Sequence, residues 1–294
     1  MSARLIWISV IILVLNLCYD YLSNRYESMQ HKPSSTKPIV IKIGGSTLSS
    51  HDTTLDDLVT LQKKGIITVV IHGGGNKITE WLKKMGVSTN FVRGMRVTDA
   101  ATLEVVVAVL AGLVNKELVA AIISKGGKAI GLSGADGGLI QAKMVNPELG
   151  YVGQVVKVNP EPVKAVLSAG YIPVIAPGGF RIAGGNGDRE MLLNINGDVV
   201  ASEIAGALQA ERLIFLTDVP GVRDGKGKFL PRLSAAEAKD MIASGVIAGG
   251  MIPKVEACLN ALSRVPSAQI VDGRTAGALL SAIEKENIGT RIEP

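Results

Sequence analysis

Short apolar segments rich in β-branched residues alternate with helix-like segments along most of this 294-residue chain. Ile39–Ile43 and Ile66–Ile71 have the length and composition of buried strands, and glycines close both of them. Leu55–Lys64, between them, has the apolar spacing of a helix. Regular alternation of strands and helices predicts an α/β fold, a three-layer α/β/α sandwich around a mostly parallel central sheet.

The alternation continues towards the C-terminus, with a hairpin expected from Leu139–Lys143 and Tyr151–Val158. Further strands are predicted at Ala129–Leu132, Ile172–Ala176, Leu213–Leu216 and Ala268–Val271. Further helices are predicted at Ile78–Met85, Ala100–Ala111, Val114–Ser124, Pro162–Ala169, Val199–Leu208, Ala235–Ser244, Ile252–Ser263 and Ala278–Glu284. Because glycines cluster near residues 180–210, we expect two lobes, one of residues 38–208 and one of residues 209–294.

The composition narrows the class of protein. Aromatic residues make up only 4% of the chain, so Val, Ile, Leu and Ala must build the core, as in buried parallel strands and their covering helices. The formal net charge is +5, of which residues 38–294 contribute only +3, and this argues against nucleic acid as a partner. Cys18 and Cys258 form neither a disulfide framework nor a zinc motif, which fits a reducing cytoplasm.

Residues 1–37 stand apart as an N-terminal extension with a short apolar segment, Leu5–Tyr19. That segment is about 15 residues long, whereas a membrane-spanning helix needs about 20. Membrane association would depend on this segment alone, and the positive charges that follow it would keep the body in the cytoplasm. Three interpretations stay open: a weak anchor, a flexible or surface-packed helix, and a misassigned start codon with translation beginning at Met29.

Two glycine turns follow the first two predicted strands. Gly44-Gly45 ends the first strand, and Gly73-Gly74-Gly75 ends the second, directly before a predicted helix. Without a Cβ, such turns let backbone N–H groups approach an anion, and a helix N-terminus adds to the attraction. A simple tight turn is the alternative for the first of them. The chain contains neither a P-loop motif nor the glycine motif of dinucleotide-binding folds.

Three charged residues are candidates for catalysis. Lys42 lies in an apolar strand, where a lysine needs an anion unless its side chain reaches solvent at the sheet end. Lys254 follows Gly249-Gly250 near the start of an apolar helix, and taken alone it would be an exposed lysine. Asp198 could cap its helix, or it could hold both lysines in place and reduce their mutual repulsion.

Two further side chains are candidates for binding or for shaping the site. Arg96 could grip a substrate carboxylate with two hydrogen bonds, or it could lie on the surface. His72, beside the glycines, could be a ligand or a base. For His72 we favour a third interpretation, a packed and hydrogen-bonded histidine that shapes the loop.

In this order, the motifs closely resemble the amino-acid kinase family and, within it, the N-acetylglutamate kinases. The resemblance covers about residues 38–292. Its motifs are Ile41–Gly45, Val70–Gly75, Gly94–Asp99, Leu110–Leu118, Gly131–Gly134, Asn194–Asp198, Leu216–Val222 and Gly249–Cys258. The resemblance implies ATP-dependent phosphorylation of the γ-carboxylate of N-acetyl-L-glutamate to N-acetylglutamyl 5-phosphate, the second step of arginine biosynthesis.

The resemblance also implies a role for each candidate. Lys42 and Lys254 would neutralise charge on the transferring phosphoryl group, and Asp198 would orient both lysines. Amides of the two glycine turns would contact the phosphates and the attacking carboxylate. The substrate side would comprise Gly73, Gly74, Arg96 and Asn194, the last two holding the α-carboxylate; the nucleotide side would comprise Gly44, Gly45, Asp218, Gly225 and Lys226. Mg²⁺ would bridge the phosphates of ATP and need no dedicated protein site.

The chemistry agrees with this residue set. The nucleophile is a carboxylate, and with an ordinary pKa of about 4.3 it is already ionised at neutral pH. No general base is therefore needed, which explains a set rich in lysines and amides without an obvious catalytic histidine or cysteine. Catalysis would consist of positioning and charge stabilisation of an in-line transfer.

Two departures from the family pattern concern regulation and assembly. Arginine-inhibited members carry an N-terminal helix before the first strand, whereas Pro33–Pro38 cannot form one here. Gly277 stands where many relatives have a histidine. We therefore predict a cytoplasmic, arginine-insensitive homodimer that buries apolar helix and strand surface of the first lobe.

Two other functions stay open as alternatives. A kinase for the longer N-acetylaminoadipate, of lysine biosynthesis, would differ by one methylene, which is worth only about 1–3 kcal/mol of discrimination. A non-catalytic regulatory or binding protein would be favoured by loss of Lys42, Asp198 or Lys254, and all three are present.

Overall fold

The structure, a computed structural model, describes residues 37–45, 53–92, 94–182, 191–284 and 288–294. Residues 35–294 form one compact unit. The apolar segment Leu5–Tyr19 and the alternative start at Met29 fall outside the described residues, so the three interpretations of the N-terminus stay predictions. The expected division into two lobes also stays a prediction.

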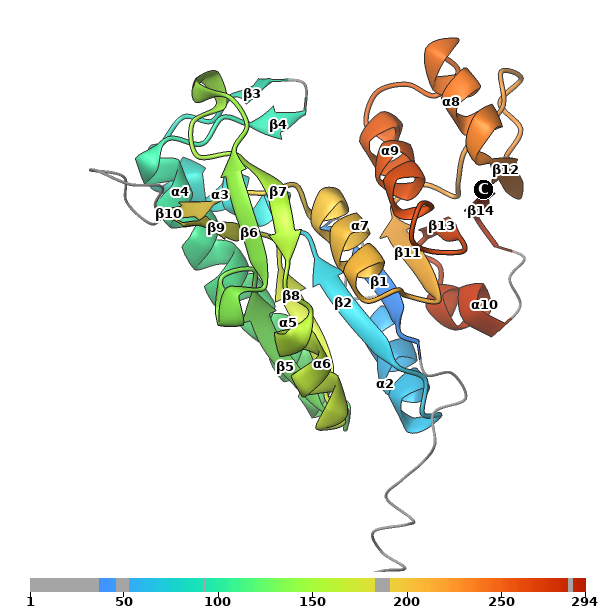
Figure 1. Cartoon of the computed structure of the whole chain (residues 1–294), viewed down its shortest axis with the longest axis horizontal. Helices are drawn as coiled ribbons and strands as arrows, with labels where there is room; N and C mark the ends of the chain where they lie inside the picture. Colours follow the sequence, from blue (N-terminus) through green and yellow to red (C-terminus); the bar gives the residue numbers. More distant parts are fainter. Residues whose placement is uncertain (1–36, 46–52, 93, 183–190, 285–287) are drawn as a thin grey trace, which may run out of the picture. The chain divides into compact units, whose positions relative to one another are not determined.

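An eight-stranded sheet forms the centre of the body, in the order β12-β14-β13-β11-β1-β2-β8-β5 (Figure 1). Parallel pairing runs from β13 through β11, β1, β2 and β8 to β5, whereas β14 is antiparallel to β13 and β12 follows the direction of β14. The prediction of a mostly parallel sheet is confirmed. Its strands are β1 (Ile39–Ile43), β2 (Thr68–His72), β5 (Ala129–Ser133), β8 (Ile172–Ala176), β11 (Arg212–Thr217), β12 (Arg232–Ser234), β13 (Ala268–Asp272) and β14 (Thr290–Glu293).

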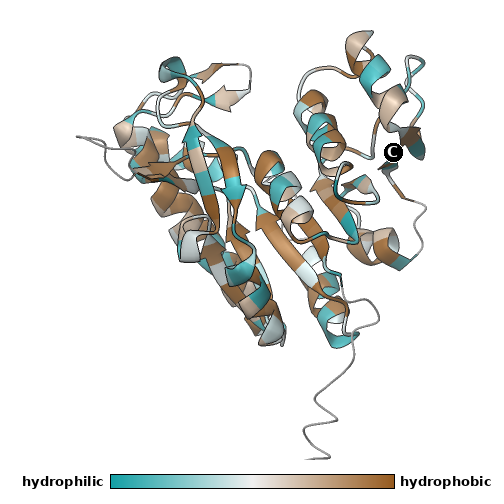
Figure 2. Cartoon of the chain, in the orientation of Figure 1, coloured by the Kyte–Doolittle hydropathy of each residue, from teal (hydrophilic) through white to brown (hydrophobic). Residues whose placement is uncertain are grey.

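Helices cover both faces of this sheet, which confirms the three-layer sandwich (Figure 1). Apolar side chains of the strands alternate between two buried clusters, and Figure 2 shows this apolar character along the central strands. One cluster packs under α2 (Thr54–Lys63), α3 (Gly75–Lys84), α4 (Ala100–Val107), α5 (Asn115–Ser124) and α10 (Ala278–Glu284). The other packs under α6 (Glu161–Ser168), α7 (Gly197–Ala207), α8 (Ala235–Ala243) and α9 (Met251–Ala261).

A second, four-stranded sheet with the order β10-β9-β6-β7 contains the predicted hairpin. Its strands are β6 (Ile140–Met144), β7 (Gly153–Val158), β9 (Gly179–Arg181) and β10 (Met191–Leu193). Antiparallel pairing of β6 with β7 confirms the hairpin. The short pairs β9–β10 and β3 (Phe91–Val92) with β4 (Met95–Arg96) were not predicted, because two- or three-residue strands carry no readable apolar period.

The prediction of two separate helices over residues 100–124 was wrong. A π-helical segment, Ala108–Val114, joins α4 to α5 without a break, although Gly112 lies in it. Among the described residues, this stretch, Ala100–Ser124, is the one long and apolar enough to cross a membrane, with 39% of its most apolar window buried. It packs against α2, β5 and β8, as a covering helix of a sandwich does.

Candidate active site

The site lies where parallel strands end. Because β1, β2 and β11 run in parallel and in register, Ile43 stands beside His72 and Leu216, and the glycine turns follow at the same edge. Ile41 and Ile43 point to the α2–α3 face of the sheet. Lys42, between them, therefore points to the opposite face, where α7 and α9 pack.

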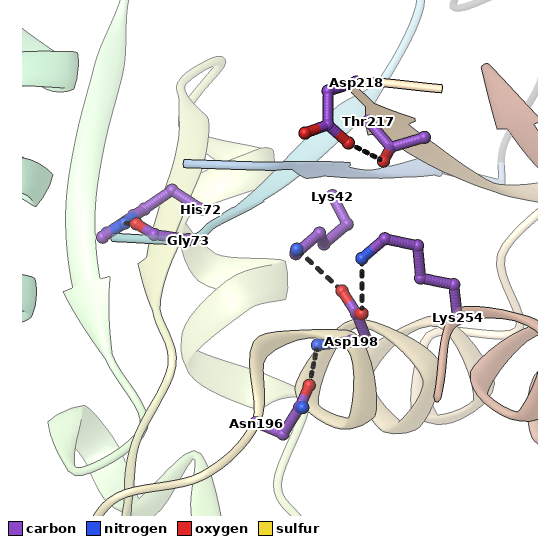
Figure 3. Close-up of polar contacts among 8 residues, drawn as sticks. All are labelled: Lys42, His72, Gly73, Asn196, Asp198, Thr217, Asp218 and Lys254. Carbon is purple, nitrogen blue, oxygen red and sulfur yellow. Dashed lines mark hydrogen bonds and ion pairs between the residues drawn. The ribbon is translucent and has the colours of Figure 1, made fainter. Parts of the chain in front are cut away.

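Two lysines meet one carboxylate on that face (Figure 3). Nζ of Lys42 lies 2.7 Å from Oδ1 of Asp198, and Nζ of Lys254 lies 3.1 Å from Oδ2. Asn196 caps α7, since its Oδ1 accepts a hydrogen bond of 2.7 Å from the Asp198 amide. The carboxylate of Asp198 is thus not the helix cap, and the alternative of an exposed Lys254 is excluded for a side chain that is 23% exposed.

The charges of this cluster depend on one another. Burial by itself raises the pKa of Asp198, but the neighbouring ammonium groups of Lys42 and Lys254 outweigh burial and hold that pKa below its ordinary value. The carboxylate stays ionised at neutral pH and offsets one of the two positive charges. The cluster therefore carries a net positive charge of one, which suits an anionic ligand.

A cavity of about 590 Å³ opens beside the cluster. It contains seven of the predicted site residues in its lining: Lys42, Gly45, Gly73, Gly74, Arg96, Asn194 and Asp198. Apolar side chains from the hairpins complete the wall, among them Phe91, Met95, Val152 and Val155. A small acid with an apolar substituent fits this combination of positive charge, amides and apolar wall.

The two glycine turns interlock at the cavity. A Cβ on Gly73 would lie 2.9 Å from the Gly45 nitrogen, and a Cβ on Gly45 would lie 3.2 Å from the Gly74 nitrogen. The amides of Gly44 and Gly73 are already used, since they donate to the carbonyls of Leu216 and Ile43 at 2.9 and 2.8 Å. This corrects the expectation that all four glycines donate amides, and it leaves Gly45 and Gly74.

Arg96 also lines the cavity and is 7% exposed. Its Nη2 donates to Oγ1 of Thr79 at 2.8 Å and to the carbonyl of Gly75 at 3.1 Å, and its Nη1 donates to Oγ1 of Thr89. The ring of Phe91 covers it, with 4.6 Å between Cζ and the ring centre. The alternative of a surface arginine is excluded.

Asn194 is connected to the same wall. Its Nδ2 donates to Oγ1 of Thr98 at 3.1 Å, and Thr98 Oγ1 in turn donates to the carbonyl of Arg96 at 2.8 Å. Arg96 and Asn194 are thus brought to one cavity although 97 residues separate them in sequence.

A second pocket, of about 280 Å³, lies beside the segment that follows β11. None of the predicted nucleotide residues lines it: Gly45 lines the larger cavity, whereas Asp218, Gly225 and Lys226 lie in the same chain segment as residues 219–223 of the lining. Asp218 directly precedes Val219, and Gly225 and Lys226 lie in the turn where Oδ1 of Asp224 accepts from the Lys226 amide at 2.9 Å. The lining is mostly apolar: residues 219–223, Phe229, residues 246–248 and Met251. The resemblance assigned the segment from Asp218 to Lys226 to the nucleotide, which covers residues 219–223 of this lining, but sequence reasoning missed Phe229, residues 246–248 and Met251.

Among the described residues, no group of three or more His, Cys, Asp or Glu side chains could hold a metal ion. The carboxylate of Asp198, which lines the cavity, already contacts two lysines.

The sequence pattern described as "Amino acid kinase family" matches residues 37–272. The chain belongs to the amino acid kinase family. Acetylglutamate kinase from Dehalococcoides mccartyi is 48% identical over 264 residues, which are 90% of this chain and 97% of that protein. Acetylglutamate kinase from Carboxydothermus hydrogenoformans is 47% identical over 277 residues, covering 88% of this chain and 92% of that protein.

A solved structure supports the same family. The structure of N-acetylglutamate synthase from Neisseria gonorrhoeae, complexed with coenzyme A and N-acetyl-glutamate, matches with a TM-score of 0.75 and 26% identity. The match covers 88% of this chain and 59% of that chain. The amino acid kinase fold, predicted from the order of motifs, is therefore confirmed.

Proposed function

We propose that the chain is an acetylglutamate kinase, which transfers the γ-phosphoryl group of ATP to the γ-carboxylate of N-acetyl-L-glutamate in arginine biosynthesis. The observation that supports this most is a single cavity lined by Lys42, Asp198 and Arg96, in which the buried Asp198 carboxylate also contacts Lys254. The two relatives named acetylglutamate kinase, nearly half identical over almost their whole length, support the substrate assignment.

The cavity suggests how the substrate binds. The α-carboxylate would pair with the guanidinium of Arg96 and with the amide of Asn194, and the acetyl group would contact the apolar wall near Val152. The γ-carboxylate would then lie towards Gly45 and Gly74, whose amides have no partner among the described residues. Binding both ends fixes the attack direction and supplies the orientation on which the reaction depends.

The reaction forms one bond and breaks one bond. A γ-carboxylate oxygen attacks the terminal phosphorus of ATP, the bond from that phosphorus to the β–γ bridging oxygen breaks, and ADP leaves with the bond's electron pair. No proton is transferred. Lys42 and Lys254 would stabilise negative charge on the transferring group and on the leaving oxygen, and Asp198 would keep both ammonium groups aimed.

ATP would enter as its Mg²⁺ complex. We propose that the adenine ring occupies the apolar pocket beside Val219 and Phe229, with Asp218, Gly225 and Lys226 along its border. The phosphates would then extend towards Gly44-Gly45 and the two lysines. The cation shields charge on the phosphates when bound, and the chain needs to supply no ligand set of its own.

The test is acyl-phosphate formation trapped as the hydroxamate, with N-acetylglutamate and N-acetylaminoadipate assayed side by side on the full chain. Clear preference for N-acetylglutamate supports the proposal, and preference for the longer acid transfers the assignment to the lysine-type kinase. No turnover of either by folded protein refutes the proposal and favours a binding protein. The same assay on protein beginning at Met29 shows whether residues 1–28 matter for catalysis.

We further propose a cytoplasmic homodimer that joins along the helical stretch Ala100–Ser124. Its exposed residues include the small or apolar Ala101, Ala108, Gly112 and Ile123, and the charged residues exposed on the same stretch are Glu104, Lys116 and Glu117. Edge strand β5 lies beside it at the end of the sheet. Sedimentation of wild-type chain and of Gly112→Arg tests this, since a charged side chain on the seam would shift a dimer to monomer. Arginine insensitivity is tested by titrating arginine to millimolar levels.

A further inference from the structure

The geometry points to His72 as a positioning residue, which holds the Gly73–Gly74 peptide so that the Gly74 amide faces the transferring phosphoryl group. This inference rests on the proposed function and adds a residue that acts through the glycine turn. Its basis is a chain of hydrogen bonds that begins at a surface lysine and ends at the cavity.

Lys116 fixes the orientation of the Asn115 amide. Its Nζ lies 2.9 Å from the Oδ1 atom of Asn115, and an ammonium group can only donate, so the atom facing it must be oxygen. Nδ2 of Asn115 therefore carries the two hydrogens. It directs them to the carbonyl of Val174 at 2.8 Å and to Nε2 of His72 at 3.2 Å, while the carbonyl of Leu132 lies farther away, at 3.4 Å.

Asn115 in turn fixes the tautomer of His72. Because Nδ2 of Asn115 donates to Nε2, that ring nitrogen must be an acceptor, and the proton of a neutral ring sits on Nδ1. The ring is neutral, since burial above all lowers the pKa of His72 to about 4 and the side chain is fully buried. Nδ1–H then donates to the carbonyl of Gly73 at 2.8 Å (Figure 3).

A hydrogen bond to the Gly73 carbonyl orients the next amide. The C=O of Gly73 and the N–H of Gly74 belong to one trans peptide plane and point in opposite directions. His72 stands opposite Ile43 in the sheet, so its ring lies on the α2–α3 face, away from Lys42. Drawing the carbonyl to that face turns the Gly74 N–H to the side of Lys42 and the cavity.

Packing around Gly74 also keeps the glycine turn in this position. Within the described part of the chain, the Gly74 amide has no hydrogen-bond partner, so it is free for a ligand. Leu110, from the π-helical segment, packs so closely on Gly74 that a Cβ there would lie 2.5 Å from Leu110 Cδ2. The same helical stretch thus carries Leu110 above Gly74 and Asn115 against His72.

Two substitutions separate the two hydrogen bonds of the ring. His72→Asn keeps an N–H at the place of Nδ1 and loses the contact with Asn115; His72→Gln keeps an acceptor near the place of Nε2 and loses the bond to Gly73. Loss of an amide donor to the transition state costs about 100–1000-fold in kcat, and a misaimed amide less. We expect His72→Gln to lower kcat about 10–100-fold with KM for both substrates within about threefold, and His72→Asn to keep kcat within about threefold of wild type.

Equal kcat for His72→Gln and wild type, or equal losses in both variants, would overturn the inference. A measurement without turnover guards against variants that do not fold: ¹⁵N spectroscopy of the wild-type imidazole at pH 7. A proton on Nδ1 supports the inference, and a proton on Nε2 overturns it. If the wild-type chain phosphorylates neither acyl amino acid, the proposed function fails, whereas the tautomer still decides how the glycine turn is held.

Discussion

Nζ of Lys42 lies 2.7 Å from Oδ1 of Asp198, with the two side chains 11% and 6% exposed, so this ion pair is nearly closed to solvent. Removing the carboxylate would leave Lys42 beside Lys254 without a counter-charge, and breaking a buried pair in this way costs about 3–5 kcal/mol. We expect Asp198→Asn to lower the unfolding temperature by roughly 5–15 °C and kcat by at least ~100-fold. Calorimetry and the hydroxamate assay measure the two effects.

Lys42→Met separates catalysis from stability in the same cluster. Asp198 would keep Lys254 as its partner, so we expect a change of less than about 2 kcal/mol in unfolding free energy but a loss in kcat of ~100-fold or more. Glu161→Gln is the matched control, since it breaks an exposed pair with Lys164 and should change neither quantity. Wild-type kcat in either site variant would contradict the roles assigned to the cluster.

His72 makes stability depend on pH. Its pKa falls from 6.5 to about 4 on folding, chiefly because of burial, so below pH 6.5 the unfolded chain binds a proton that the folded chain does not. The folding free energy of the chain with neutral, buried His72 is therefore undiminished above pH 6.5, and part of it is lost as pH falls towards 4. We expect wild type to lose up to about 3 kcal/mol over that interval relative to His72→Asn. Urea denaturation between pH 4 and 8 gives the difference, and parallel curves for the two proteins would refute it.

Two aromatic rings, each against an arginine, distinguish the two binding pockets. The ring centre of Phe229 lies 4.5 Å from Cζ of Arg223, and Phe229 lines the 280 Å³ pocket. The ring centre of Phe91 lies 4.6 Å from Cζ of Arg96, and Phe91 lines the 590 Å³ cavity. We expect Phe229→Ala to raise KM for ATP about 5–20-fold and to leave KM for N-acetylglutamate unchanged. Phe91→Ala should do the reverse. Each variant is the control for the other in steady-state kinetics, and equal effects on both KM values would contradict the assignment of the pockets.

The fold was predictable where a segment has a clear apolar pattern and a length typical of a strand or a helix. Strands β1, β2, β8 and β11 are short, rich in β-branched residues and followed by turns or glycines, and these features favour strands over helices. The break expected between Ala111 and Val114 failed for a physical reason. Gly112 weakens a helix by only about 1 kcal/mol, and burial of Val109, Leu110 and Val114 on the sheet outweighs that cost.

Sequence reasoning named seven residues that line one cavity, but it did not predict the hydrogen bonds among them. Lys42 stood out because an unpaired lysine in an apolar strand is costly, and its partner Asp198 could be proposed from charge alone. Which glycine amides stay free depends on sheet register, since the ladder uses those of Gly44 and Gly73. The tautomer of His72 depends on Asn115, 43 residues away, and sequence spacing cannot show such a contact.

Gly73 and Gly45 define how closely the two glycine turns approach. A Cβ on Gly73 would lie 2.9 Å from the Gly45 nitrogen and 3.5 Å from the Ile43 carbonyl oxygen, both of them backbone atoms that cannot rotate away. Gly73→Ala must therefore spread the turns by some tenths of an ångström, and misplacement of about 1 Å can cost ~100-fold in rate. We expect kcat to fall about 10–100-fold in the hydroxamate assay.

Two further alanine variants make this prediction specific. Gly45→Ala meets the Gly74 nitrogen at 3.2 Å, a milder approach, and should lose less kcat than Gly73→Ala. Gly250→Ala has open space around its new Cβ and should behave as wild type. If all three variants lost activity equally, the approach of the two turns would not be the cause, because Gly250→Ala introduces no close contact. We expect the largest loss of kcat at Gly73, a smaller loss at Gly45 and none at Gly250, because steric repulsion grows as the new Cβ comes closer to its neighbour.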